Sequence, residues 1–235
     1  MAVSATHLDG ATGGVVVLFA LEREAAPFRR AARALRGVSI HVTGIGSRAG
    51  AFVGRLLTDA RPGCVVMAGF CGALRPALAV GDVVVPGDVI DPAGNRWPCP
   101  DGTPGVRLLT APELVATPAE KRHLHERHWA DIVDMESAAV AAACAERGVP
   151  FRAVRAVSDT ADTALSPRLV KMLSGGNVSP WRAAAALVRQ PSLLGEFLRL
   201  ARDTKFAAER LGEALLEVVR EKNPRTEAVR GLSGG

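Results

Sequence analysis

The 235-residue chain is 48% hydrophobic and 23% charged, and its formal net charge is +5. That length and apolar content predict one substantial α/β domain with a large core. The modest charge, spread without a basic block, argues against nucleic acid as a partner, and no apolar run is long enough for an integral membrane segment. The start of the sequence lacks a basic region followed by a cleavage site, so we expect a cytoplasmic protein.

The cysteines show none of the close paired spacings of a metal or redox motif. Two of them, Cys64 and Cys144, lie in apolar patterns and are expected to be small core residues. Free thiols are typical of a reducing compartment, which agrees with the cytoplasm. The complete set is Cys64, Cys71, Cys99 and Cys144.

The first predicted strand runs directly into the first predicted helix. Residues 1–13 are expected to be a flexible leader, and residues 14–20, GVVVLFA, read as a strand. The segment LEREAAPFRRAARAL follows, with apolar residues on one helical face. Glu22 and Glu24 therefore lie where the carboxyl end of a strand meets a helix N-terminus. Structure alone explains acids at such a place, because the helix dipole favours negative charge there.

Two more strands each lead into a glycine-containing segment. Residues 38–43 form a strand pattern, and the turn that contains Gly46 then opens a helix. A single GxG is only a weak phosphate-binding signal. Residues 64–69 form the next strand. We expect Gly69 and Gly72 in a turn after it, where the backbone approaches a ribose or a phosphate.

The middle of the chain combines short strands with a loop and one helix. A strand is expected over residues 83–85, a Pro- and Gly-rich loop over residues 91–105, and a short strand over residues 106–110. Residues 117–128 read as a helix whose N-cap threonine is followed three residues later by Glu120, a capping box.

Three histidines on that helix raise the question of a metal site. His123, His125 and His128 lack HExxH spacing, and His123 and His125 point to different helix faces. We therefore expect a solvated helix face and no metal.

The most informative stretch runs from Asp131 to Asp162. Its alanine-rich helix, expected over residues 135–147, is apolar all round except for Glu136 near its N-terminus, where a buried anion costs least. A near-continuous apolar strand, residues 151–159, then ends on acids. Ligands of open α/β sheets bind beyond such strand ends. Helix-start and turn roles explain the same acids without any function.

The remainder of the chain is predicted to be helical. One helix is expected to start at Ser179 or Pro180, and a long amphipathic helix is expected from Pro191 or Ser192 to about Val219. Its predicted apolar stripe is expected to pack on the sheet or on a partner subunit. We assign residues 14–220 to a single domain and residues 221–235 to a flexible tail. The stripe consists of Leu194, Phe197, Leu198, Ala201, Ala208, Leu211 and Leu215.

The motifs DMESAAVA and VRAVSDTAD, at their mutual spacing, resemble the nucleoside phosphorylase and methylthioadenosine/S-adenosylhomocysteine nucleosidase superfamily. The resemblance covers residues 14 to 165. It implies an α/β fold of three layers, with a mixed central sheet between helices, and cleavage of a purine N-glycosidic bond. The DMES motif and the helical C-terminal part look most like the hopanoid-associated branch, which acts on adenosylhopane.

The resemblance also implies roles for individual residues. Asp159 would protonate or hydrogen-bond the leaving adenine, and Glu24, at the ALERE junction, would position the attacking water. Glu136 would accept hydrogen bonds from ribose hydroxyls, and Met135 would cover the sugar. The family also implies a homodimer and no metal or organic cofactor. Further substrate-binding positions are Asp134, Ser158, Phe70, Gly69 and Gly46.

Three alternatives stay open at this point. Phosphorolysis needs an anion site, but VVMAGFCGAL places Met67 and Phe70 where family phosphorylases have an arginine and a serine, which favours water as the attacking group. Arg48 or Arg75 could still supply such a site. A non-catalytic nucleoside-binding relative would not need the general acid. A Rossmann-type dehydrogenase would need a dinucleotide fingerprint that the chain lacks.

Overall fold

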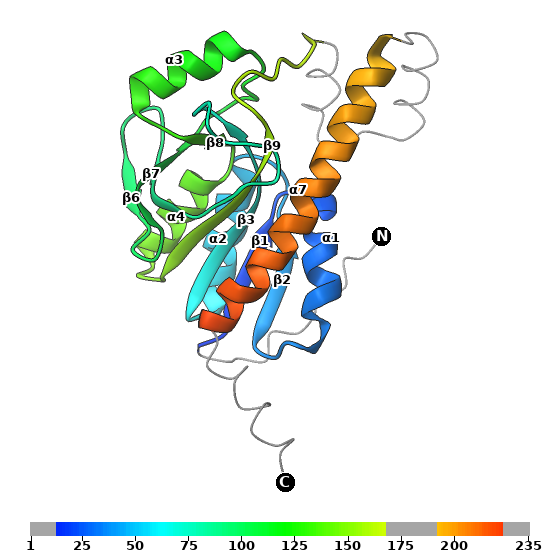
Figure 1. The fold of residues 1–235 in the computed structure, drawn as a ribbon. Helices are drawn as coiled ribbons and strands as arrows, with labels where there is room; N and C mark the ends of the chain where they lie inside the picture. Colours follow the sequence, from blue (N-terminus) through cyan, green and yellow to red (C-terminus); the bar gives the residue numbers. More distant parts are fainter. Residues whose placement is uncertain (1–12, 168–191, 223–235) are drawn as a thin grey trace.

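The computed structural model describes residues 13–167 and 192–222, and within these ranges nine strands form one mixed sheet (Figure 1). The predicted α/β fold with a mixed central sheet between helices is confirmed. The elements in chain order are β1 Val15–Phe19, α1 Glu22–Ala31, the 3-10 turn Ala32–Ala34, β2 Val38–Val42, α2 Arg48–Asp59, β3 Cys64–Ala73, β4 Val83–Val84, β5 Pro86–Ile90, β6 Arg96–Pro98, β7 Thr103–Thr110, α3 Pro118–His128, β8 Ile132–Asp134, α4 Ser137–Glu146, β9 Phe151–Asp159 and α7 Ser192–Lys222.

Helices cover both faces of the sheet (Figure 1). Successive residues of a strand point to opposite faces, so Val15, Val17 and Phe19 of β1 pack under α1 and α7. Val16 and Leu18 of the same strand pack under α2 and α4. These three layers bury β1 on both faces, which explains why its sequence is continuously apolar.

Strand β3 is the longest strand, and its two edges are paired differently. One edge pairs with β9 in parallel, from Val65 to Gly72. The other edge pairs with β1 in parallel as far as Ala68, and then with β8 in the antiparallel direction from Gly72. On this edge of β3, residues 69–71 pair with neither β1 nor β8, which leaves a gap in the ladder.

This pairing corrects two sequence-based expectations. Gly69 and Gly72 were expected in a turn, but both lie inside β3, because β9 carries the ladder past the point where β1 ends. The segment expected to be a loop over residues 91–105 contains β6 and the start of β7, which pair with β5 on either side. The strand Pro86–Ile90 was not predicted at all.

Other predictions hold, with small shifts at the ends of elements. Strand β9 has the predicted bounds, and α3 begins with the predicted capping box of Thr117 and Glu120. Helix α4 starts two residues later than expected, so Glu136 is its N-cap. The free cysteines Cys64 and Cys144 are both buried, as predicted.

Helix α7 is in the core over its second half only. Leu211 and Leu215 are fully buried against β1 and α1, whereas Leu198 and Ala201 of the predicted stripe are exposed. Among the described members of the stripe, those from Ala208 onward are buried. The helix ends at Lys222, so Glu221 and Lys222 belong to it and not to a tail.

Some predictions concern residues outside the described ranges. These are the leader over residues 1–12, the helix that was expected to start at Ser179 or Pro180, and the tail from residue 223 onward. Within the described residues, no helix combines the length and the apolar character that crossing a bilayer requires.

Candidate active site

Glu24 fills the gap in the β3 ladder. Its Oε1 accepts a hydrogen bond from the Phe70 amide at 3.0 Å, and its Oε2 accepts one from the Leu21 amide at 2.8 Å. The first turn of α1 carries this side chain from the end of β1 to the middle of β3. Glu24 is 4% exposed, and its burial raises the pKa of the carboxyl. Glu22, two residues earlier, is exposed and pairs with Arg29.

Arg155 lies beside Glu24 and is fully buried within β9. Its Nη2 donates to Ser137 Oγ at 2.8 Å and forms an ion pair with Asp134. Its Nε and Nη1 find no hydrogen-bond partner among the described residues. A Cβ at Gly69 would lie 2.6 Å from Nη1 and 3.1 Å from Glu24 Oε1. Gly69 therefore provides the space in which these two groups approach each other.

Asp134 and Thr110 hold the N-terminus of α4. Asp134 Oδ2 accepts from the Ser137 amide at 3.0 Å, and its Oδ1 accepts from Thr110 Oγ1 at 2.7 Å. Thr110 Oγ1 in turn accepts from the Ala138 amide at 2.9 Å. These two side chains cap the helix, so the carboxylate of Glu136 is not needed for that purpose.

Glu136 instead reaches across to the turn that precedes α2. Its Oε1 accepts from the Gly46 amide at 2.9 Å, and its Oε2 accepts from its neighbour, the Met135 amide, at 3.3 Å. Gly46 has φ of +73°, a conformation that glycine adopts without strain. Burial and then the negative charge of Asp134 raise the pKa of Glu136 to about 7. The half-buried Met135 lies at the same strand end.

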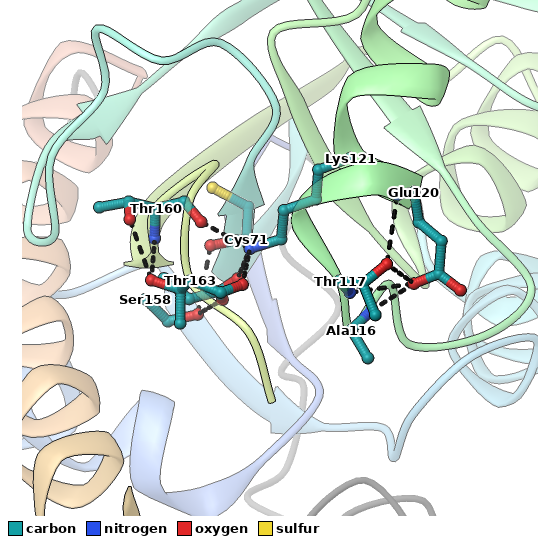
Figure 2. A network of polar contacts seen from close by, with 9 residues as sticks. Cys71, Ala116, Thr117, Glu120, Lys121, Ser158, Thr160 and Thr163 are labelled. Carbon is teal, nitrogen blue, oxygen red and sulfur yellow. Dashed lines mark hydrogen bonds and ion pairs between the residues drawn. The ribbon is translucent and has the colours of Figure 1, made fainter. Parts of the chain in front are cut away.

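Asp159, at the end of β9, has a different environment from the one expected. Its Oδ2 pairs with Lys121 Nζ at 2.5 Å, and its Oδ1 accepts from Ser158 Oγ at 2.8 Å. Figure 2 shows Lys121 reaching from α3 towards Ser158 and Cys71. The sequence-based hypothesis placed Asp159 among other acids, whereas its direct partners are an ammonium and a hydroxyl. A motif search cannot reveal this cation, because α3 and β9 lie far apart in the sequence.

Phe70 contacts the site through its backbone. Its amide binds Glu24, whereas its ring packs with the apolar cluster under α1 and α7, with Arg23 5.9 Å from the ring centroid. Alternation along β9 puts Arg155 on the other face of the sheet, towards Ser137. The ring and the carboxylate cluster therefore lie on different faces of the sheet.

The structure thus brings Glu24, Asp134 and Glu136 together around one guanidinium, because the charge of Arg155 acts on both Glu24 and Glu136. Sequence reasoning missed Arg155 and Lys121. The one available signal for Arg155 was a charged residue in the middle of an apolar strand. Such a residue is rarely buried without a partner or a purpose.

The other cations that were considered lie elsewhere. Arg75 pairs with Asp131 at 3.3 Å, and Arg48 is exposed at the start of α2. His125 Nδ1 is 2.7 Å from the Ala130 carbonyl oxygen. Within residues 13–167 and 192–222, no group of three or more His, Cys, Asp or Glu side chains is arranged to hold a metal ion.

Carboxylates thus gather around a buried guanidinium at strand ends of a mixed three-layer α/β fold. The family model described as the Phosphorylase superfamily matches residues 28–116 and 106–173. The chain therefore belongs to the Phosphorylase superfamily. This confirms the expected enzyme class, nucleosidase or nucleoside phosphorylase.

Solved structures show the same fold. The 5′-methylthioadenosine/S-adenosylhomocysteine nucleosidase of Helicobacter pylori, solved in complex with a substituted pyrrolidinol, is 15% identical, with a TM-score of 0.65 and coverage of 90% of this chain and 99% of that one. Futalosine hydrolase of the same organism is 15% identical, with a TM-score of 0.66 and coverage of 89% and 98%. The 5′-methylthioadenosine nucleosidase of Arabidopsis thaliana is 16% identical, with a TM-score of 0.66 and coverage of 92% and 98%.

Proposed function

We propose that this chain hydrolyses the N-glycosidic bond of a purine nucleoside and releases free adenine. The observation that carries the proposal is the cluster at the gap in β3. There a buried Glu24 faces the unpartnered Nη1 of Arg155, beside Glu136. A carboxylate that accepts hydrogen bonds and a guanidinium N–H that donates one can together orient a water molecule that binds next to them. Burial raises the pKa of Glu24, which makes its carboxylate a better base towards that water.

The proposed reaction gives separate roles to Glu24, Asp159 and Glu136. The bond from the sugar C1′ to the purine nitrogen breaks, its electron pair goes to the purine, and positive charge develops on the sugar. The water oxygen bonds to C1′, and Glu24 takes the proton that water loses. Asp159 gives a proton to a ring nitrogen of the departing purine. Glu136 binds the ribose hydroxyls, and its negative charge stabilises the cationic sugar.

Water is favoured over phosphate as the attacking group by the charges of the site. Glu24, Asp134 and Glu136 contribute three carboxyl groups, whereas Arg155 is the one described cation in contact with them and is already paired with Asp134. A phosphate dianion would be repelled at that place. The ion pair of Arg75 with Asp131 weighs against Arg75 as the phosphate anchor considered above.

The finer proposal is a 5′-substituted adenosine with a bulky apolar group, of the adenosylhopane kind, processed in hopanoid biosynthesis. It rests on the resemblance of the DMES motif and of the helical C-terminal part to that branch, and on the segment over residues 91–105, which is shorter than the corresponding segment of the nucleosidases that the chain resembles. We also propose that the protein is cytoplasmic, in line with its four free buried cysteines. The family resemblance further suggests a homodimer. Light scattering during gel filtration measures the subunit number directly.

The test is to incubate the purified protein with adenosine, methylthioadenosine and a 5′-alkyl adenosine, with and without millimolar phosphate, and to measure free adenine. Hydrolysis predicts release at a phosphate-independent rate and a free sugar product.

The Asp159→Asn variant should lose about two to four orders of magnitude in turnover while keeping its fold. Strict phosphate dependence with a sugar 1-phosphate product would overturn hydrolysis in favour of a phosphorylase. Tight binding without turnover would indicate a non-catalytic nucleoside binder. Equal or better turnover of plain adenosine would overturn the lipid-linked substrate.

A further inference from the structure

Lys121 is a fully buried cation that the reaction proposed above does not use. It projects from the first turns of α3 into the strand-end region (Figure 2). Its Nζ contacts Asp159 Oδ2 at 2.5 Å, the Thr160 carbonyl at 2.6 Å and the Thr163 carbonyl at 3.4 Å. An ammonium has three N–H donors and no acceptor. The three donors therefore have three oxygen atoms within reach.

The segment that follows Asp159 is attached to α3 at a second point. The Leu165 amide donates to the Ala116 carbonyl at 2.9 Å, just before the N-cap of α3. Thr160 and Thr163 also bond to each other, through their hydroxyls, at 2.9 Å. The carboxyl group of Asp159 is thus held between Ser158 and a helix that is itself fixed by a capping box.

We propose that Lys121 is the positioning residue of the general acid. It fixes Asp159 Oδ2 and stabilises the carboxylate that forms as Asp159 gives its proton to the departing purine. The inference rests on the proposed function and deepens it. A neighbouring cation favours the ionised form of a carboxyl group, so the transfer of the proton to the base becomes less costly. The ion pair in the structure corresponds to Asp159 after its proton has left.

The other titratable groups near Asp159 do not supply a cation that contacts its carboxyl group. Cys71 of β3 is buried, and burial raises the pKa of its thiol well above the usual value, so it stays neutral. The charges of Arg155 and Asp134 also reach Cys71, but these two groups are paired with each other. Asp162 on the following segment is exposed. Lys121 is therefore the cation in direct contact with Asp159 among the described residues.

The test compares neutral and charged replacements. Lys121→Met should lower kcat about ten- to a hundredfold, with KM within about threefold, because the loss falls on proton transfer. The alkaline limb of its kcat/KM profile should move to higher pH, because the variant lacks the cation that contacts the Asp159 carboxylate. Lys121→Arg should leave that limb in place. Thr117→Ala, which weakens the cap of α3 without touching Asp159, should also leave it in place.

A double-variant cycle separates positioning from general stability. If Lys121 acts through Asp159, Lys121→Met should cost less than about twofold in kcat when Asp159 is already asparagine. Multiplied losses, or an alkaline limb that does not move in Lys121→Met, would overturn the proposal and leave Lys121 a structural tie. Should Lys121→Met fail to fold, Lys121→Gln provides the same comparison with a side chain that can still donate to the two carbonyls.

One measurement does not depend on turnover. In protein labelled with ¹³C at the aspartate carboxyl carbons, the signal that Asp159→Asn removes identifies Asp159. The pH at which that signal changes should be higher in the neutral Lys121 variants than in the wild type. If this holds but the wild type releases no base from any nucleoside, the proposed function fails and the effect of Lys121 on Asp159 stands. If the signal changes at the same pH in all variants, the Lys121 inference fails by itself.

Discussion

Glu22 and Glu24 lie in the same turn of α1, but their burial and their hydrogen-bond partners differ. Glu24 is 4% exposed and bonded to two backbone amides, whereas Glu22 is on the surface and paired with Arg29. We predict that Glu24→Gln lowers base release by about 10²–10⁴-fold, because an amide cannot accept the proton of the attacking water. Glu22→Gln should keep wild-type activity.

Adenine release, measured together with thermal melting of each variant, tests this prediction. Glutamine can still accept one of the two amide hydrogen bonds, so a large fraction of the fold's stability should remain. Comparable activity in both variants would show that Glu24 is a helix-start acid with a structural role only.

At the residue scale, the strand ends, the helix starts and the family resemblance together selected Glu24, Glu136 and Asp159 as candidates, and their catalytic roles stay predictions. These signals did not identify what surrounds them. The cation next to Asp159 comes from α3, and the one next to Glu24 lies inside β9. Contacts between distant segments arise from the order of strands in the sheet, which one sequence does not encode as a local pattern.

The long strand β3 depends on a glycine where other elements approach it closely. An added Cβ at Gly69 would meet Arg155 Nη1 at 2.6 Å, whereas one at Gly54 in α2 would meet nothing within 4 Å. We predict that Gly69→Ala reduces turnover about a hundredfold by displacing Arg155 or Glu24. Gly54→Ala should raise the free energy of unfolding by about 0.4–1 kcal/mol and leave turnover unchanged. Steady-state kinetics and urea unfolding distinguish the two; a fully active Gly69→Ala variant would contradict the close approach.

Helix α7 provides a second comparison within one element. Leu211 is fully buried under the sheet, and Leu198 is 57% exposed. Leu211→Ala should lower the free energy of unfolding by about 2–5 kcal/mol, because it leaves a cavity in the core. Leu198→Ala should change it by less than about 0.5 kcal/mol. Equal losses at the two positions would mean that the first half of α7 is packed in solution.

Element prediction succeeded where a local signal was strong. The capping box predicted the start of α3, and the near-continuous apolar run that ends on acids predicted both ends of β9. It failed at Gly69 and Gly72, because glycine is typical of turns, whereas here it makes room for side chains that approach the strand from Glu24, Arg155 and Asp159. It also failed over residues 91–105, where pairing with β5 converts a Pro- and Gly-rich segment into strands.

For the whole molecule, the buried acids make stability depend on pH. Glu136 in the folded protein has a pKa of about 7, against 4.5 for the ordinary group. The folded state therefore binds more protons in that interval, and stability falls as pH rises from 4.5 through 7. At about 1.4 kcal/mol per pH unit, the loss is on the order of 3 kcal/mol.

Glu136→Gln removes this dependence because the amide does not titrate. The variant should therefore melt at a higher temperature than the wild type at pH 8 and lose most of that advantage at pH 5. The pKa of Glu24 is raised in the same direction by burial, and the negative charge of Glu24 is one cause of the raised pKa of Glu136. A difference in melting temperature that is constant from pH 5 to pH 8 would contradict the raised pKa of Glu136.

Because β1 and β8 leave a gap along β3, the backbone amide of Phe70 donates its hydrogen bond to Glu24 and can report changes at the site. The Phe70 amide has a carboxylate oxygen as its acceptor in a strand whose flanking residues are paired with neighbouring strands. Protonation of Glu24, or ligand binding next to it, changes the strength of that single bond. The nitrogen and proton resonances of Phe70, and the rate at which its amide exchanges with deuterated solvent, therefore report the state of the site without any label on the substrate.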